Sequence, residues 1–276
     1  MRCTGSNDPG SLVQWLKDGN SNSKFFHAQA TSRRANNRMV GLFDVHGIWQ
    51  ETPVALEEII QSYYTNIFTS SLPSNEHLAA VLDCVNPCIS PSMNHLLDRA
   101  FTPHEVKAAL FNMFSTKVSR LDGMPALFYQ KYWDRVGGLV TTACLRCLND
   151  GRSVKALNST LIVLIPKIPN PTRIVDFRPI SLCNVIYTIV AKALVNCFRY
   201  VLGNVISENQ SDFLPGQLIT NNAIIGYECT QLIWRRFKGK VGHFALKLDM
   251  SKAYDRVEWS FLHGMLIRLG FSYSWV

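Results

Sequence analysis

The stretch from His243 to Trp259, HFALKLDMSKAYDRVEW, constrains the fold most, because a strand pattern changes into a helix pattern within it. Before Asp249, apolar residues occupy every second position, which is the period of a strand: Phe244, Leu246 and Leu248. After Asp249, apolar residues recur mostly at three- and four-residue steps, as in an amphipathic helix: Tyr254, Val257, Phe261, Met265 and Leu269. Gly270 follows, at a position that a helix C-terminus favours. The Asp249 carboxylate is therefore predicted at a junction between a strand and a helix.

Asp249 has two interpretations at such a junction. A rigid strand end suits an Asp that ligates Mg²⁺, because this ion takes oxygen ligands in a strict octahedron. Alternatively, Asp249 ends the strand as a turn residue or caps the helix with its side chain. Spacing alone favours the second interpretation, since a lone Asp after an apolar strand is common.

The identities of the residues add a resemblance to a known family. The string LDMSKAYDRVEW resembles motif A of reverse transcriptases, in the form found in plant non-LTR (LINE-type) retrotransposons. The resemblance implies that Asp249 is catalytic and ligates Mg²⁺, helped by the backbone carbonyl of Met250. It also implies that Tyr254 is the aromatic gate that packs under the incoming sugar. Asp255 matches a polar position that is not a metal ligand.

A second group of residues surrounds a predicted hairpin. The chain reads LIVLIPK up to Lys167, then a turn with Pro and Asn, then DFRPISL around Arg178. Two antiparallel strands would bring both cations to one fingertip, where Lys offers a triphosphate a point charge and Arg a planar fork. The residues alone equally allow two solvated charges beside a hairpin. The strings resemble the IPK and FRPISL motifs of reverse transcriptase fingers, which implies that Lys167 and Arg178 contact the phosphates of the incoming nucleotide.

The segment Ser207–Glu228 resembles the next motif of that family, which lies against the template strand. The matching positions, which the resemblance implies bind template, are Gln210, Phe213, Pro215 and Gly216. Gln217 and Asn221 depart from the motif, which usually has Arg and Asp there. Losing the Arg removes a phosphate-pairing charge, which weakens the expected template binding. Without the resemblance, the segment is a loop followed by an amphipathic helix.

Two earlier segments resemble the same family. Residues 11–50 mix basic and aromatic side chains, a composition that suits nucleic acid binding but also a solvated helix with aromatics packed inward. Within them, WLKDGNSNSKFFH resembles the segment between the endonuclease and the reverse transcriptase of the plant elements. Residues Thr116–Trp133 resemble the approach to the fingers, although only Asp122 and Gly123 of the usual Pro-Gly-Pro-Asp-Gly loop remain.

Helix and loop signals mark other positions. Thr52 followed by Pro53 predicts the start of a helix, and the Ser-, Pro- and Asn-rich residues 69–77 predict a loop. The Thr-Pro-His-Glu sequence at residues 102–105 predicts a capping box at the start of a further helix.

The eight cysteines are scattered, as free thiols in a reducing compartment usually are. Cys144 and Cys147 form a CxxC pair, but their surroundings predict an apolar helix. A zinc site is the lesser alternative, because it would want two tight pairs around a compact loop.

Composition and charge narrow the class of protein. The chain of 276 residues is 47% hydrophobic and 17% charged, as expected of a globular protein. A net charge of +8 favours an anionic partner, with nucleic acid first and a membrane surface second. No apolar run reaches the length of a membrane span, the closest being Ala156–Pro166, and no signal-peptide core is present. We therefore predict an intracellular protein, in the nucleus or cytoplasm, without a membrane partner.

Together, the motifs predict an α+β chain with right-hand polymerase fingers and a partial palm, preceded by a mainly helical extension. The predicted boundaries are 1–95 for the extension, 96–148 for the lead-in to the fingers and 149–276 for the reverse transcriptase domain. The resemblance implies an RNA-directed DNA polymerase that copies an RNA template from a DNA primer with deoxynucleoside triphosphates. The oligomeric state is not predicted.

One motif of such enzymes is missing from this sequence. Polymerases of this type hold two metal ions with carboxylates from two motifs, the second being a Tyr- or Phe-x-Asp-Asp box. No Asp-Asp pair occurs in the 276 residues, so we expect a chain truncated before that box and inactive in isolation. Two alternatives stay open: a catalytically silent fragment that binds RNA or an RNA–DNA hybrid, and a decayed element without a stable role.

Overall fold

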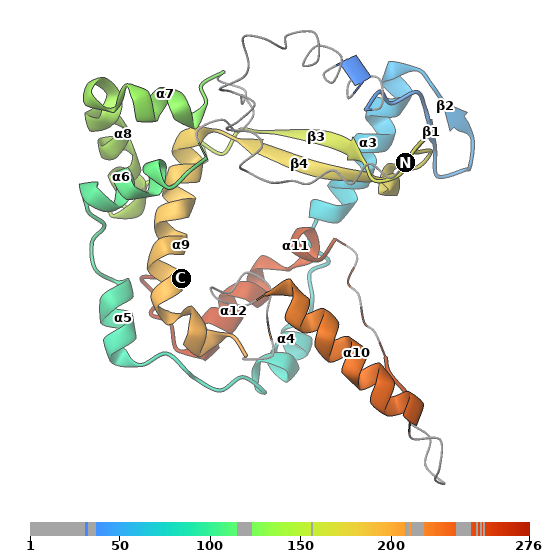
Figure 1. Ribbon diagram of the computed structural model, residues 1–276. Coiled ribbons are helices and arrows are strands. Elements are labelled where there is room, and N and C mark those ends of the chain that lie inside the picture. Colours follow the sequence, from blue (N-terminus) through green and yellow to red (C-terminus); the bar gives the residue numbers. More distant parts are fainter. Residues whose placement is uncertain are drawn as a thin grey trace. The chain divides into compact units, whose positions relative to one another are not determined.

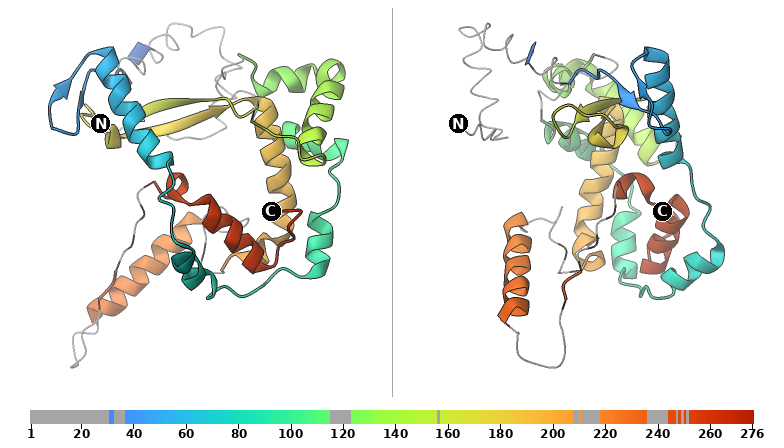
Figure 2. Two further views of the ribbon diagram at one scale, coloured as in Figure 1. Left: turned by 180° about the vertical axis from the view of Figure 1, so that it is seen from behind. Right: turned by 90° about the vertical axis from the view of Figure 1, so that its right-hand side faces the viewer.

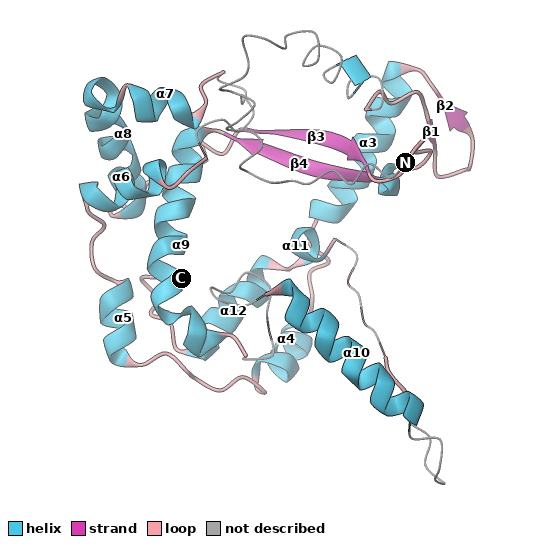
Figure 3. Cartoon of the chain, viewed as in Figure 1, coloured by secondary structure: helices cyan, strands magenta, loops and turns pink. Residues whose placement is uncertain are grey.

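A computed structural model describes most of the chain (Figure 1). The described residues are 31–32, 37–114, 123–155, 157–207, 210, 218–235, 244–246, 248, 250 and 252–276. The chain divides into two compact units: the first combines residues 1–65 with 162–181, and the second combines 66–161 with 182–276. The described residues form helices, two small sheets and the loops between them, which confirms the predicted α+β class (Figure 3). The assignment to polymerase fingers and palm, and the boundaries at 95 and 148, stay predictions.

A short hairpin opens the described part of the first unit. Its strands, β1 (Leu42–Phe43) and β2 (Trp49–Gln50), pair antiparallel. The Asp44 carboxylate closes the turn, because it accepts hydrogen bonds from the backbone N–H of Ile48, 2.9 Å, and from the Gln50 side chain, 3.0 Å. These bonds hold the pKa of Asp44 below its usual value, with the bond from Ile48 contributing most.

Helix α3 (Pro53–Phe68) starts where the sequence predicts it. The Thr52 hydroxyl accepts a hydrogen bond from the backbone N–H of Ala55, 3.4 Å, and so caps the first turn. The core of the first unit takes its buried side chains from β1, α3 and the residues before and in β4: Leu42, Tyr64, Ile174 and Phe177. Leu42 and Phe177 have no exposed surface.

The second sheet is a hairpin of two seven-residue strands. β3 (Thr160–Pro166) and β4 (Phe177–Cys183) lie side by side and run in opposite directions (Figure 1). One turn of 3₁₀-helix, Ile174–Asp176, leads into β4. The Asp176 carboxylate accepts a hydrogen bond from the backbone N–H of Arg173, 3.0 Å, which fixes that turn. The predicted antiparallel pair is confirmed.

Helices make up most of the second unit (Figures 1 and 2). In chain order they are α4 (Asn75–Leu82), α5 (Pro91–Leu97), α6 (Pro103–Phe111), α7 (Ala126–Lys131), α8 (Trp133–Leu148), α9 (Val185–Val205), α10 (Ile219–Arg235), α11 (Ala253–Arg256) and α12 (Trp259–Leu269). Helix α4 starts inside the predicted loop 69–77, so that prediction is wrong from Asn75 onward. The Ser74 side chain accepts a hydrogen bond from the backbone N–H of His77, 3.3 Å, and this cap turns the end of the polar stretch into a helix start.

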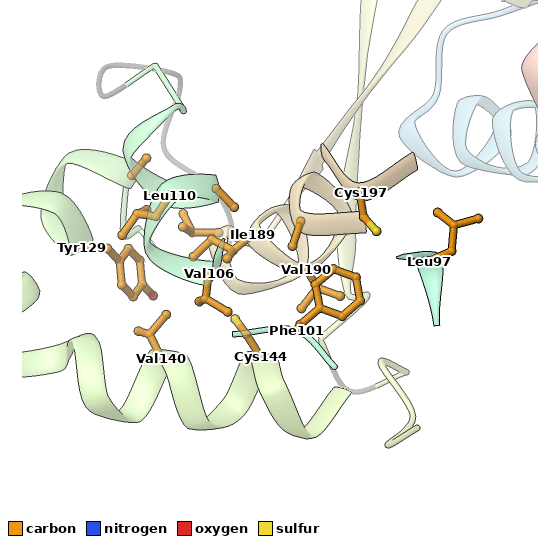
Figure 4. Packing of buried hydrophobic residues seen from close by; sticks show 14 of the residues in the cluster. Leu97, Phe101, Val106, Leu110, Tyr129, Val140, Cys144, Ile189, Val190 and Cys197 are labelled. Carbon is orange, nitrogen blue, oxygen red and sulfur yellow. The ribbon is translucent and has the colours of Figure 1, made fainter. Parts of the chain in front are cut away.

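The core of the second unit lies between α6, α8 and α9 (Figure 4). Each of these helices contributes side chains without exposed surface, among them Val106, Cys144 and Ile189. Burial raises the pKa of the Cys144 thiol to about 12, and the neighbouring Cys147 adds to the shift. Both cysteines lie within α8, which confirms the predicted apolar helix across the CxxC pair.

The capping box at the start of α6 is confirmed. The Glu105 carboxylate accepts hydrogen bonds from the backbone N–H and the hydroxyl of Thr102, both 2.9 Å, and an ion pair joins it to Arg99 at 2.6 Å. Burial acts to raise the pKa of Glu105, but the hydrogen bonds from Arg99 and Thr102 outweigh it, so the pKa lies below its usual value. The box therefore holds a charged Glu at the positive end of the helix dipole.

One helix among the described residues, α9, is long and apolar enough to cross a membrane on length and composition alone. The sequence-based prediction considers uninterrupted apolar runs and therefore does not include Val185–Val205. Lys192 and Arg199 interrupt the apolar residues of this helix. One face of α9 packs into the core of the second unit: Val185, Ile189, Val190, Ala193, Cys197 and Val201.

Candidate nucleotide-binding site

The β3–β4 hairpin carries both cations that are predicted to bind phosphate. Lys167 directly follows β3, and Arg178 is the second residue of β4. Both side chains are exposed. Because the strands are antiparallel, these positions lie toward the same end of the hairpin. The structure thus brings Lys167 and Arg178 together on one element, as the sequence predicts, while their contact with phosphate stays a prediction.

Two hydrogen bonds tie Lys167 to the other side of the turn. Its backbone N–H donates to the carbonyl of Asp176 and its Nζ donates to the carbonyl of Val175, both at 2.7 Å. The ammonium group keeps two further donors, since a Lys side chain has three. A phosphate oxygen that accepts from these donors would meet a cation already held by the hairpin.

The other half of the predicted site is less completely described, because Asp249 lies outside the described residues. Its described neighbours 244–246, 248 and 250 form no strand, so the strand prediction is wrong for them. Phe244 and Leu248 are 85% and 83% exposed. A strand is stabilised by hydrogen bonds to a neighbour, and no other strand in the described part of the chain pairs with these residues.

The predicted helix after Asp249 is two helices. Helix α11 carries the exposed Tyr254, and α12 begins only at Trp259. Between them Glu258 has an extended backbone, with φ −69° and ψ 132°. The helix ends as predicted: Gly270 has φ 97°, and its N–H donates to the carbonyl of Ile267 at 3.0 Å.

A carboxylate outside the sequence motifs, Glu258, lies at the break between α11 and α12. Both oxygens of Glu258 accept hydrogen bonds from Ser70 and Ser71, at 2.6 to 2.8 Å. These bonds lower the pKa of Glu258, with the bond from the Ser70 hydroxyl contributing most. The helical spacing hides such a break, because the partners lie about 190 residues earlier in the sequence.

The residues predicted to bind template are mostly undescribed. Gln210 is exposed and belongs to no helix or strand, and Phe213, Pro215 and Gly216 lie outside the described residues. The amphipathic helix predicted after them is present as α10, and most of its described side chains are exposed. The basic and aromatic residues up to 30 and the loop residue Asp122 also lie outside the described part.

The described residues contain no group of three or more His, Cys, Asp or Glu side chains that could hold a metal ion. Met250 is described and exposed, and it belongs to the second unit together with Tyr254. Lys167 and Arg178 belong to the first unit.

All the candidate residues fall inside one stretch that matches a known family. Residues 165–276 match the family described as reverse transcriptase (RNA-dependent DNA polymerase). This segment is similar to reverse transcriptases. The reverse transcriptase segment starts at Ile165 in β3 and therefore includes Lys167, Arg178, Asp249 and Tyr254.

A second comparison covers nearly the whole chain. It is similar to the uncharacterized 149 kDa protein of transposon TX1 from Xenopus laevis, with 30% identity over 266 residues. The similarity covers 96% of this chain, which spans only about a fifth (20%) of the length of that relative. With the reverse transcriptase segment, this finding supports the resemblance to the reverse transcriptase of a transposable element.

Proposed function

We propose that this chain is part of the reverse transcriptase of a LINE-type (non-LTR) retrotransposon of the kind found in plants, acting in the nucleus or cytoplasm. It would be an RNA-directed DNA polymerase that copies an RNA template from a DNA primer with deoxynucleoside triphosphates. The hairpin is the observation that carries the proposal: inside the reverse transcriptase segment, β3 and β4 hold Lys167 and Arg178 toward one end.

In this proposal each candidate residue has one task. Lys167 and Arg178 clamp the triphosphate, since a point charge and a planar fork together suit phosphate oxygens. Tyr254 screens the sugar of the incoming nucleotide. The residues that contact the template are Gln210, Phe213, Pro215 and Gly216.

Mg²⁺ is the proposed cofactor. The Asp249 carboxylate and the Met250 carbonyl are oxygen donors of the kind that this ion prefers. When bound, Mg²⁺ neutralises negative charge on a transferring phosphoryl group. These two donors do not complete an octahedron, and no Asp-Asp pair occurs in the 276 residues. We therefore propose that the isolated chain does not extend primers.

The exposed cations of the hairpin favour a second candidate function. A catalytically silent fragment of a decayed element could still bind RNA or an RNA–DNA hybrid through its exposed cations, since the net charge is +8. The two functions assign Lys167 and Arg178 to different ligands. A polymerase uses them for the nucleotide, whereas a binding fragment uses them for the nucleic acid backbone.

The affinity for an RNA–DNA hybrid distinguishes the two candidate functions. We would measure the affinity of the purified chain for a labelled RNA–DNA hybrid by fluorescence anisotropy over a salt series. The test variant is Lys167→Ala/Arg178→Ala. The matched control, Arg152→Ala/Lys155→Ala, removes the same two charges from exposed positions outside the reverse transcriptase segment.

The polymerase proposal expects the test variant and the control to bind the hybrid alike. The binding-fragment function instead expects a large loss of affinity for the test variant alone, with a salt slope lower by about 2. Mg²⁺-dependent primer extension by the parental chain would contradict the proposed inactivity of the isolated chain.

A further inference from the structure

The turn between β3 and β4 is bonded to β1, a strand that comes much earlier in the sequence. We call residues 167–176 the β3–β4 turn; they include Lys167. The backbone N–H of Phe43 in β1 donates to the carbonyl of Thr172 in this turn at 2.9 Å. Figure 1 shows β1 and α3 beside that end of β3 and β4. The β3 and β4 strands pair with each other, and the bond to β1 adds a separate tie at their turn.

Buried side chains join the same elements. One apolar core contains four buried residues: Leu42 of β1, Tyr64 of α3, Ile174 of the β3–β4 turn and Phe177 of β4. The half-buried Leu164 of β3 packs against this core. Because burial of apolar surface is favourable, moving the turn away from β1 would cost free energy. The core and the backbone bond therefore hold the turn against β1 together.

A series of hydrogen bonds leads from β1 to Lys167. Thr172, whose carbonyl accepts from Phe43, donates its own backbone N–H to the Asp176 carboxylate at 3.3 Å. The carbonyl of Asp176 accepts from the backbone N–H of Lys167 at 2.7 Å. The Nζ of Lys167 donates to the carbonyl of Val175, also at 2.7 Å. The backbone and the ammonium group of Lys167 are thus both bonded to the part of the turn that β1 helps to hold.

The place of β1 depends on a glycine. A Cβ at Gly41, directly before β1, would lie 2.4 Å from the Trp49 ring and 2.8 Å from the carbonyl oxygen of Gln50. That oxygen belongs to the backbone of β2, so any larger residue at position 41 must shift β1 relative to β2. The Phe43 ring packs edge-on against Trp49, with 5.0 Å between the ring centroids. A substitution at Gly41 therefore displaces β1 and leaves every residue of β3, β4 and their turn in place.

We infer that β1 positions Lys167 for the phosphates of the nucleotide, so that residues before the reverse transcriptase segment form part of its substrate site. Both β1 and α3 lie outside residues 165–276. A charged group that binds phosphate is effective only while it is held close to its working geometry. The inference rests on the proposed function, because Lys167 is the phosphate ligand proposed there.

The test measures the affinity for a fluorescent deoxynucleoside triphosphate, with an RNA–DNA primer–template and Mg²⁺ present. Gly41→Ala should weaken this affinity by about fivefold, since small displacements of a positioned group have large effects. In the Lys167→Ala background the same substitution should change the affinity by less than about twofold, because its effect passes through Lys167. A purely structural role of β1 would give equal losses in the two backgrounds.

Two further variants make the test decisive. Leu42→Val removes one methylene group from the core on β1, should weaken the affinity by about twofold, and decides the matter if Gly41→Ala fails to fold. Thr52→Ala is the control within the same unit: it removes the exposed cap of α3, so it weakens the unit without displacing β1. Its affinity should equal that of the parental chain. Amide hydrogen exchange in β3 and β4 reports that each variant is folded.

The outcomes distinguish this inference from the proposed function. Parental affinity in the folded β1 variants overturns the positioning role if Lys167→Ala alone weakens binding. Equal losses in the parental and Lys167→Ala backgrounds, or an equal loss in Thr52→Ala, also overturn it. If Lys167→Ala leaves the affinity unchanged, or the parental chain binds no triphosphate, the phosphate site of the proposed function is wrong and the positioning role falls with it.

Discussion

The β3–β4 hairpin and the described residues around Asp249 differ in how their side chains and backbone are paired. In the hairpin, the strands pair with each other within 24 residues, 160–183, and Lys167 is tied across the turn. Around Asp249, the flanking apolar residues Phe244 and Leu248 are exposed, and Glu258, nine residues later, accepts a hydrogen bond from Ser70. A local pattern therefore suffices for the hairpin, whereas Glu258, at the start of α12, bonds to residues far away in the sequence.

Core truncation gives the largest expected contrast between the two regions. Phe177→Ala should destabilise the first unit by about 3–5 kcal/mol, because Phe177 opens β4 and is fully buried. Leu248→Ala should change stability by less than about 0.5 kcal/mol, since Leu248 is 83% exposed. Denaturant unfolding of both variants measures the difference. Equal losses would mean that the Asp249 stretch is packed after all.

The capping box extends the comparison to a second locally determined element. Thr102→Ala should cost about 1 kcal/mol, because the hydroxyl accepts from the backbone N–H of Glu105 and donates to its carboxylate. Thr142→Ala is the matched control: its hydroxyl donates to the Gly138 carbonyl on an exposed face of α8, and its loss should stay within about 0.5 kcal/mol. Similar unfolding midpoints for the two variants would argue against a stabilising box.

Acid should weaken the hydrogen bonds that Glu258 accepts from Ser70 and Ser71, and it should leave the hairpin unchanged. This is the smallest expected effect. The pKa of Glu258 is lowered in the folded state, so its stabilisation is present above the ordinary Glu value of about 4.3 and is lost as pH falls through the lowered pKa. Between pH 6 and pH 3, the Leu262 amide in the first turn of α12 should lose exchange protection, corrected for intrinsic rates. The Lys167 amide donates to a backbone carbonyl and should keep its protection. Equal losses at both amides would contradict the contrast.

The elements that the sequence predicts correctly are those whose signals lie close together. Thr52 caps the turn that follows it, Thr102 and Glu105 are three residues apart, and only residues 167–176 separate the hairpin strands. Gly270 ends α12 through its own backbone conformation. Such signals are complete within a few residues, which is why spacing is enough to find them.

The features that sequence reasoning missed depend on distant partners. At the break between α11 and α12, Glu258 bonds to Ser70 and Ser71. The helical spacing of apolar residues continues through this break, so it does not reveal it. Apolar alternation before Asp249 predicts a strand, but alternation does not supply the neighbouring strand that pairing requires. For the site, the sequence predicts correctly that Lys167 and Arg178 share one hairpin, and it contains no signal for the hydrogen bonds between Glu258 and the serines Ser70 and Ser71.

The most direct test of the account is the affinity for a fluorescent deoxynucleoside triphosphate, with RNA–DNA primer–template and Mg²⁺ present. We predict that Lys167→Ala/Arg178→Ala weakens this affinity by about tenfold, since the hairpin would lose two charge-assisted phosphate contacts at an exposed site. Arg152→Ala/Lys155→Ala should leave the affinity unchanged. If the hairpin variant binds the nucleotide as tightly as the parental chain, the β3–β4 hairpin is not the triphosphate site, and the central claim is wrong.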